Sequence, residues 1–386
     1  MSKGAGKVPD RSRDGETGEP FDAGLHFLVG LPRRPDLLPA DRAMLARLRP
    51  AGVVLFRDNF RHDLPYEDWH AALGRLLAEV REAVGRPRLV VAIDHEGGDV
   101  LRTPAPLTPF AFARDWADPA TARAVGRAMG IELASLGIDV DLAPSVDVNS
   151  NPANPVIGRR AFGTTAPEVT AGAAAFLSGL EGAGLLGCLK HFPGHGATAV
   201  DPHYGLPVLD LDADALAAED LVPFAALVGG RRAVMTAHII YPRIDPGLPA
   251  TLSPRLLDGI LRGRLGHRGP IVSDDMNMAA IARHFGGADL ATRAVAAGVD
   301  LVCVCAHFGD VSLALDWAAD LEAARARGDL DPGALAASAA RVRGWLAAAP
   351  QPVARLLPPE TFAWHRSLAP LHAKGARRDG GGAGTI

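Results

Sequence analysis

Eight short apolar runs, separated by helical stretches, most strongly limit the folds open to this chain. The runs are rich in Val, Ile and Leu and show no regular alternation of apolar and polar residues. Continuous apolar strands of this kind are typical of a parallel sheet that is buried on both faces. The expected strands are residues 26–31, 52–56, 88–94, 139–148, 187–192, 233–240, 270–275 and 301–306.

Stretches rich in Ala, Leu and Arg lie between these strands. The pattern predicts helices over 68–85, 119–137, 253–266 and 288–298, and the last of these ends on a glycine, as helices often do. Eight strands that alternate with helices over about 300 residues predict an α/β fold, a (β/α)8 TIM barrel in a single domain. An open doubly wound sheet is the alternative.

The two ends of the chain differ from this pattern. Residues 1–22 are polar and rich in Gly and Pro, and we expect them to be disordered. Residues 23–349 form the expected barrel domain. Residues 350–386 are a Pro/Gly-rich tail, in which 350–366 is expected to be irregular and the low-complexity end to be flexible.

Charge and composition limit the partners. The chain has 40 basic and 44 acidic residues, a net charge of −4, which gives no electrostatic case for nucleic acid. No run of about 18 apolar residues exists, so no membrane span is expected. The N-terminus has no signal-peptide pattern, and three cysteines in apolar runs suit a reduced state, so we expect a cytoplasmic protein. We expect a monomer or a weak oligomer.

No known phosphate-binding motif supports a nucleotide cofactor. There is no GxGxxG after the first strand and no GxxxxGK[ST] anywhere in the chain. We therefore expect no cofactor.

Polar residues occur where the predicted strands end. Asp94, Asp147, the pair Lys190-His191, His238 and the run 273–275 follow or finish five different strands. In a TIM barrel these positions converge on one pocket, because the active site lies at the carboxyl ends of the strands. An ionisable side chain at a buried strand end is costly unless it is paired or functional. Taken singly, Asp275 or His238 could equally be a helix cap or a satisfied core residue.

Lys190 is unusual in this chain. The sequence has 36 arginines and four lysines, and Lys190 is the only lysine between residues 20 and 350. An ammonium is a compact point charge that a planar guanidinium does not imitate. This contrast favours a specific role for Lys190.

The segment 190–203 contains three histidines and an aspartate, and two chemistries could use them. His191 and His195 have the HxxxH spacing of a zinc site, but Pro193 and Gly194 break the helix that this motif needs. We therefore expect no metal. The second chemistry is that of sugars. Lys190 and His191 could donate hydrogen bonds to hydroxyls, and Asp201 and His203 could form a carboxylate–histidine pair. From spacing alone, a surface Asp and His without partnership remains an alternative.

At these residues the chain resembles the β-N-acetylhexosaminidases of glycoside hydrolase family 3, the NagZ type. The resemblance covers most of residues 26–310. It rests on LFRDN (55–59), DHEGGDVLR (94–102), VDLAPSVDVNSNPANPVIGRRAFG (140–163), KHFPGHG (190–196), TAHIIYP (236–242) and GPIVSDDMNM (269–278).

The resemblance implies a role for each matching residue. Asp274 would be the nucleophile that forms a covalent glycosyl-enzyme, His203 the general acid/base and Asp201 its partner. The residues that would hold the N-acetylglucosamine ring are Asp94, Arg102, Arg160, Lys190 and His191. A carboxylate nucleophile with a proton donor near the leaving oxygen is what retaining hydrolysis needs, and an imidazole can donate that proton near neutral pH.

The chain departs from the family pattern at two positions near these residues. Pro202 replaces the serine that usually lies between the aspartate and the histidine, and Asp99 stands where an arginine is common. A proline stiffens its position, so the first change bears on how the acid/base is placed. The C-terminal α/β sandwich of larger family members is also missing.

The implied activity is that of a retaining, metal-free exo-β-N-acetylglucosaminidase. Its expected substrate is a small carbohydrate or muropeptide, such as a cell-wall fragment. A GlcNAc phosphorylase is an alternative, because a histidine acid/base would not repel an incoming phosphate as a carboxylate would. A β-glucosidase fits KHFPGHG less well. A catalytically weak sugar-binding sensor on the same barrel is a third alternative.

Overall fold

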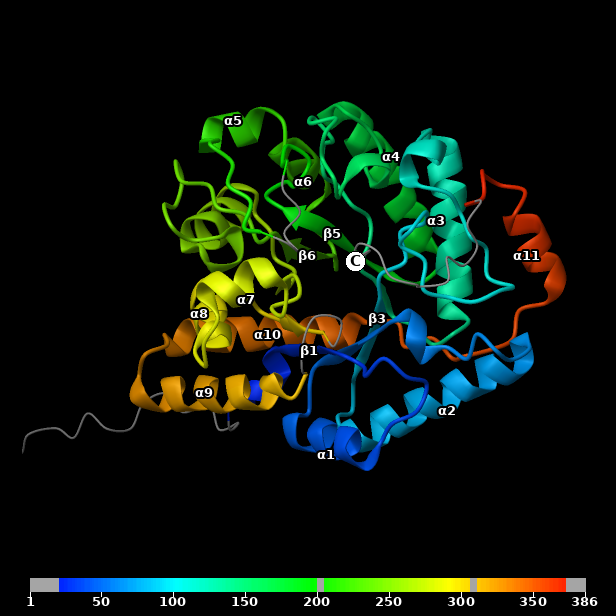
Figure 1. Cartoon of the computed structure of the whole chain (residues 1–386), viewed down its shortest axis with the longest axis horizontal. Helices are drawn as coiled ribbons and strands as arrows, with labels where there is room; N and C mark the ends of the chain where they lie inside the picture. The colour runs from blue at the N-terminus through cyan, green and yellow to red at the C-terminus, as the bar shows by residue number, and fades with distance from the viewer. Residues whose placement is uncertain (1–20, 200–204, 306–310, 373–386) are drawn as a thin grey trace, which may run out of the picture.

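The computed structural model describes residues 21–199, 205–305 and 311–372, and its centre is a parallel β-barrel surrounded by helices (Figure 1). The strands follow the order β7-β6-β5-β4-β3-β2-β1-β8. A parallel bridge between Val272 and Leu301 joins the two ends of this sheet, so the (β/α)8 TIM barrel expected from the sequence is confirmed. The strands are β1 Phe27–Gly30, β2 Gly52–Leu55, β3 Val90–Ile93, β4 Val140–Asp141, β5 Leu186–Phe192, β6 Ala233–Thr236, β7 Ile271–Val272 and β8 Val302–Val304.

Helices cover the outside of the barrel and one of its ends. The α-helices are α1 Pro39–Leu48, α2 Tyr66–Val84, α3 Pro119–Ala134, α4 Ala166–Gly182, α5 Ala213–Ala218, α6 Leu221–Leu227, α7 Ala279–Phe285, α8 Leu290–Ala296, α9 Leu313–Arg327, α10 Pro332–Ala348 and α11 Pro359–His365. The 3₁₀ helices are η1 Ala23–His26, η2 Arg57–Asn59, η3 Ala113–Trp116, η4 Gly158–Arg160 and η5 Ala250–Leu252, and η6 Arg255–Arg264 is a π-helix. Within the described ranges, no helix has the length and apolar character needed to cross a membrane.

Each strand buries both of its faces, which explains the continuous apolar runs. In β1, Leu28 belongs to the apolar cluster inside the barrel, whereas Phe27 and Val29 belong to the cluster between the sheet and the helices. Trp345 and Leu346 of α10 join the interior cluster together with residues that precede the strands. Helix α10 therefore closes the amino-terminal end of the barrel, and the carboxyl end is left for the site.

Several helices begin where the sequence supplies a capping group. The Asp118 side chain accepts hydrogen bonds from the backbone N–H groups of Ala120 and Thr121 at the start of α3. The Asp331 side chain does the same for Ala334 in α10. A proline occupies the first helical position in both helices, where its missing N–H costs nothing.

Two predicted elements differ in extent or type. The strand expected over 139–148 is reduced to two residues, although the chain beyond Asp141 stays beside β5, where Ser145 forms an isolated parallel bridge with Lys190. The helix expected over 253–266 is the π-helix η6, which buries Leu256, Leu257, Ile260 and Leu261 against the core.

The two ends are more ordered than the sequence suggests. Phe21 and Asp22 lie within the segment expected to be disordered, yet the guanidinium of Arg325 lies over the Phe21 ring at 5.2 Å, and Asp22 pairs with Arg86 at 2.7 Å. Residues 1–20 lie outside the described ranges. These contacts make Phe21 and Asp22 part of the packed structure.

The expected irregular structure of 350–366 is wrong for Pro359–His365, which forms α11 beside α2 and α3 (Figure 1). Phe362 is buried against the core, and Nδ1 of His365 lies 2.7 Å from Glu132 of α3. Beyond this helix, the backbone of Leu371 pairs with that of Phe110. A proline at the first helical position, the buried Phe362 ring and the contact between His365 and Glu132 all favour an ordered helix here.

Candidate active site

Six of the predicted site residues lie where strands end or just beyond, on the carboxyl side of the barrel. They are Asp94 and Arg102 after β3, Arg160 in the long loop after β4, Lys190 and His191 in β5, and Asp274 after β7. Asp201 and His203, the predicted acid/base pair, lie outside the described residues, as does Pro202. The structure therefore brings together the predicted nucleophile and the predicted sugar-binding residues.

Lys190 is the centre of a buried ion-pair network. Its Nζ atom lies 2.6 Å from Oδ1 of Asp94 and 2.6 Å from Oε1 of Glu96. Arg160 binds the same Glu96 carboxylate with two nitrogens, at 2.9 and 2.8 Å. The Lys190 side chain is only 1% exposed, so this ammonium is held entirely by its partners. A bidentate guanidinium on one side of Glu96 and a point charge on the other fix the network geometry.

Opposite charges within the network favour the ionised forms of Glu96 and Lys190. Burial by itself would raise the pKa of Glu96, but the charges of Arg160 and Lys190 hold that pKa well below its usual range. Burial would lower the pKa of Lys190, whereas Asp94 and Glu96 raise it above its usual value. The network thus places fixed charges at the carboxyl end of the barrel.

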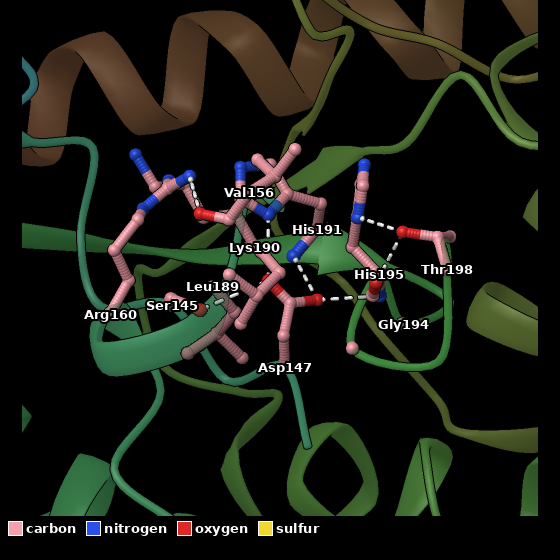
Figure 2. A network of polar contacts seen from close by, with 12 residues as sticks. Ser145, Asp147, Val156, Arg160, Leu189, Lys190, His191, Gly194, His195 and Thr198 are labelled. Carbon is pink, nitrogen blue, oxygen red and sulfur yellow. Dashed lines mark hydrogen bonds and ion pairs between the residues drawn. The ribbon is translucent and has the colours of Figure 1, made fainter. Parts of the chain in front are cut away.

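Asp147, in the loop after β4, organises the segment that follows Lys190 (Figure 2). One carboxylate oxygen accepts hydrogen bonds from the backbone N–H groups of His191 and His195, at 3.1 and 2.7 Å. The other accepts from the Ser145 hydroxyl at 2.9 Å and lies 2.7 Å from Nδ1 of His191.

The Asp147 carboxylate also determines which nitrogen of His191 can meet a ligand. Burial would raise the pKa of Asp147, but the His191 imidazole and the hydrogen bonds hold it well below its usual range. An ionised carboxylate only accepts, so Nδ1 of His191 carries a proton and donates a hydrogen bond to Asp147. The Nε2 atom is left for a ligand.

The two adjacent aspartates after β7 have different environments. Oδ1 of Asp275 accepts hydrogen bonds from the backbone N–H groups of Asn277 and Cys305, and burial raises the pKa of Asp275 to about 7. Burial alone would raise the pKa of Asp274. His238, His191 and Lys190 together lower that pKa below its usual value. Neighbouring carboxyls whose pKa values are pushed apart take different roles. The lowered pKa favours an ionised Asp274, whereas Asp275 is tied to the backbone.

The two histidines of the HxxxH spacing are engaged by other partners. Nδ1 of His195 lies 3.0 Å from the Thr198 hydroxyl, and the rings of His191 and His195 are 5.8 Å apart in a perpendicular arrangement. Among the described residues, no group of three or more His, Cys, Asp or Glu side chains is arranged to hold a metal ion.

Sequence reasoning missed Glu96 and the function of Asp147 as a hydrogen-bond acceptor. Glu96 lies two residues after Asp94 and is followed by Gly97 and Gly98. Its partner Arg160 is 64 residues away, so no local pattern joins them. Asp147 was expected only as a polar group at a strand end.

Asp99, where the family commonly has arginine, lies at the outer edge of this region. Its carboxylate is half exposed and lies 3.2 Å from Nε2 of His372, in the segment after α11. The same histidine ring packs edge-on against Phe112. The change from arginine therefore creates a contact that attaches the C-terminal segment to the loop after β3.

The fold and the site together define a class of protein. A TIM barrel that presents one ionised carboxylate beside a ring of buried cations and acids suits a hydroxyl-rich ligand and a nucleophilic carboxylate. A glycoside hydrolase has these parts.

The family comparison agrees with this class. Residues 37–344 match the model of the glycosyl hydrolase family 3 N-terminal domain. A beta-hexosaminidase of Alkalilimnicola ehrlichii is 39% identical over 280 residues, which cover 69% of this chain and 77% of that protein. The chain belongs to glycoside hydrolase family 3 and is a glycoside hydrolase.

Solved structures of the same family share the architecture. A family 3 beta-N-acetylglucosaminidase from Paenibacillus sp. superposes with a TM-score of 0.81 at 30% identity, covering 90% of this chain and 67% of that one. NagZ from Neisseria gonorrhoeae, solved with N-trifluoroacetyl-D-glucosamine, superposes with a TM-score of 0.69 at 28% identity, covering 89% of this chain and 96% of that one.

Proposed function

We propose that the chain is a retaining exo-β-N-acetylglucosaminidase. The observation that carries this proposal is the Asp274 carboxylate, whose pKa is lowered by His238, His191 and Lys190 at the carboxyl end of the barrel. The relatives named beta-hexosaminidase and the neighbour solved with an N-acylated glucosamine support a hexosamine as the sugar.

The proposed reaction has two steps. Asp274 attacks the anomeric carbon, the bond to the leaving oxygen breaks, and His203, partnered by Asp201, gives that oxygen a proton. Water then attacks the glycosyl-enzyme, His203 takes its proton, and Asp274 is released. Lys190, His191, Asp94, Arg102 and Arg160 hold the sugar ring. A carboxylate that is already ionised can attack without a general base, which suits the lowered pKa of Asp274.

The proposed natural substrate is a cell-wall fragment with a terminal β-linked GlcNAc, handled in the cytoplasm. This part rests on the resemblance to the NagZ type.

The test is turnover of 4-nitrophenyl β-GlcNAc and 4-nitrophenyl β-glucoside, with and without phosphate. We expect hydrolysis of the GlcNAc compound alone, and a loss of at least ~10³-fold in Asp274→Ala. Asp316→Ala, which removes an exposed carboxylate on α9, is the matched control and should keep full activity. GlcNAc-1-phosphate as product would replace the hydrolase with a phosphorylase. Binding of GlcNAc without any turnover would replace it with a sensor.

A further inference from the structure

A cavity of about 810 Å³ lies at the amino-terminal end of the barrel. Its lining comes from η1, from the ends of α1 and α2 with the turns that follow them, and from α9 and α10 (Figure 1). The turns after α1 and α2 lead into the starts of β2 and β3. The cavity therefore lies at the opposite end of the barrel from the strand ends that carry Asp94 and Asp274.

The lining of this cavity is strongly positive. Five arginines and two acids, Asp22 and Glu322, contribute to it, which is an excess of three positive charges. The arginines are Arg47, Arg49, Arg86, Arg88 and Arg343. The whole chain has a net charge of −4, so this excess is local and opposite in sign to the rest. A concave site lined by one sign of charge concentrates ligands of the other sign.

Arg86 joins three of the segments that line the cavity. Its Nε atom donates to the carbonyl oxygens of Arg49 and Pro50, at 2.5 and 3.1 Å, and its Nη2 atom lies 2.7 Å from Oδ1 of Asp22. The Arg86 side chain is 9% exposed. Burial lowers the pKa of Arg86 despite Asp22, and the charges of Arg49 and Arg343 act in the same direction. Asp22 therefore does not compensate all of the positive charge around it.

Arg49 occupies a backbone position that ordinarily favours glycine. It ends α1 in the left-handed conformation, with φ 52° and ψ 59°, where a Cβ atom is unfavourable. Its Nη2 atom lies 3.4 Å from the carbonyl oxygen of Gly85, at the end of α2. Arg49 and Arg86 thus bind carbonyl groups at helix ends and in turns, and this structural role fixes the basic side of the cavity.

Arg47 and Arg88 are different, because no structural partner uses their guanidinium groups. Both residues are exposed, and neither forms a hydrogen bond or an ion pair with another described residue. Both nevertheless line the same cavity as Arg86. Their donors are available to a ligand, and a guanidinium can donate two parallel hydrogen bonds to one phosphate or carboxylate group.

The part of the lining that comes from α9 and α10 is mostly apolar. Leu315 and Ala318 of α9 and Leu346 and Ala347 of α10 contribute to it. A site that combines charged donors with apolar side chains suits a ligand that has anionic groups and an uncharged organic part.

We propose that this cavity binds a small organic molecule that carries two phosphate groups. A terminal phosphate has a charge of about −1.5 to −2, so two phosphates balance the three excess positive charges. The volume of about 810 Å³ falls within the range of roughly 300–1,000 Å³ that is usual for small-molecule sites. The inference does not depend on the proposed function, since none of these residues belongs to the candidate active site.

The test is calorimetric titration of the full chain with pyrophosphate and with ADP at low ionic strength, where charge attraction is least screened. We expect both to bind, and ADP to bind more tightly because its adenosine part can cover the apolar lining. Weaker binding of ADP than of pyrophosphate would overturn the assignment of an organic ligand.

The variants are Arg47→Gln and Arg88→Gln, which remove one guanidinium each. We expect each to weaken the binding of both compounds by about fivefold or more. Both should unfold at the wild-type temperature, because neither side chain has a hydrogen-bond partner among the described residues. Arg75→Gln is the matched control, since Arg75 is an exposed arginine of α2 that does not line the cavity, and it should bind like wild type.

Absence of binding would overturn the proposal. Unchanged binding in both cavity variants would place the phosphates elsewhere on the protein, and an equal loss in Arg75→Gln would show unspecific charge attraction. Either result would overturn the proposal as well. Binding to phosphatidylglycerol vesicles without binding of the soluble phosphates would assign the arginines to a lipid surface instead.

One further variant tests whether the chain's own acids compete for the cavity. Asp14, Glu16 and Glu19 shortly precede Phe21 in the sequence, and Phe21 lines the cavity. The full chain with Asp14→Asn, Glu16→Gln and Glu19→Gln should bind pyrophosphate as wild type does. Binding in this variant alone would assign the cavity to these acids and overturn the proposal of a separate ligand.

Discussion

Nζ of Lys190 lies 2.6 Å from Oδ1 of Asp94, and this ion pair joins strand β5 to the loop after β3. Because Glu96 lies at the same distance from this Nζ atom, one ammonium contacts two acids, and Arg160 contacts the second of them as well. Lys190→Met would leave both acids in a buried place with one cation fewer. We predict a loss of about 3–5 kcal/mol in the free energy of unfolding, measured by denaturant titration, and a large loss of kcat/KM.

The Lys190→Arg variant tests whether the site needs only a positive charge or also the compact shape of the ammonium group. The guanidinium keeps the positive charge but is wider, and the 1% exposure of Lys190 leaves no space for it. We predict a fall in kcat/KM of about tenfold or more, with a smaller loss of stability than in Lys190→Met. The exposed exchange Arg75→Lys on α2 is the control. Wild-type kinetics in Lys190→Arg would show that only the charge matters.

Asp147→Asn tests the orientation of His191. The asparagine side chain would present an NH₂ group to one of the groups that now donate to the carboxylate. Partners that orient a functional imidazole typically contribute 10–100-fold, so we predict a fall of about that size in kcat/KM on 4-nitrophenyl β-GlcNAc. Asp214→Asn, on the exposed side of α5, is the control. Activity within twofold of wild type would mean that His191 needs no such support.

Asp220→Asn should change how stability depends on pH. Burial, together with Asp147 and Glu219, raises the pKa of Asp220 to about 7, and Oδ1 of Asp220 has no partner among the described residues. The folded state then holds a proton that the unfolded state releases between pH ~4 and ~7, so this group's stabilising effect is lost as pH rises through that window. We predict that Asp220→Asn gains roughly 1–3 kcal/mol relative to wild type between pH 5 and pH 8. Parallel stability curves for the two proteins would contradict the assigned pKa.

Phe362→Ala tests whether α11 is part of the barrel's packing. Phe362 is 1% exposed and packs edge-on against Tyr66 of α2. We predict a loss of about 3 kcal/mol by thermal or denaturant unfolding, since a cavity would replace a buried ring. Trp364→Ala is the matched control, because Trp364 on the same helix is 53% exposed and should cost less than about 0.5 kcal/mol. Equal effects of the two changes would show that the helix only rests on the surface.

The barrel could be predicted from the sequence because strands buried on both faces leave a continuous apolar run. The run 52–56, for example, became β2, in which Val53 faces the helices and Val54 faces the interior. Helix α11 could not be predicted in the same way. It depends on a single buried phenylalanine and on the pairing of His365 with Glu132, 233 residues earlier.

The candidate site also combines features that could be predicted from the sequence with features that could not. Ionisable residues at strand ends, such as Lys190 and Asp274, could be predicted because active-site residues of this fold lie at the carboxyl ends of the strands. The contacts that hold them join loops far apart in the chain, as between Asn154 and His195, 41 residues on. Nothing in the spacing of either residue indicates its partner.

The central claim is that Asp274 is the nucleophile, and covalent labelling tests it most directly. A 5-fluoro β-N-acetylglucosaminyl fluoride should form a glycosyl-enzyme faster than water removes it, so that mass spectrometry of the digested protein can locate the sugar. We predict one labelled peptide, with the sugar on Asp274, and no labelling of Asp274→Ala. Labelling on Asp275 or another residue, or turnover of the reagent with no covalent adduct, would contradict it.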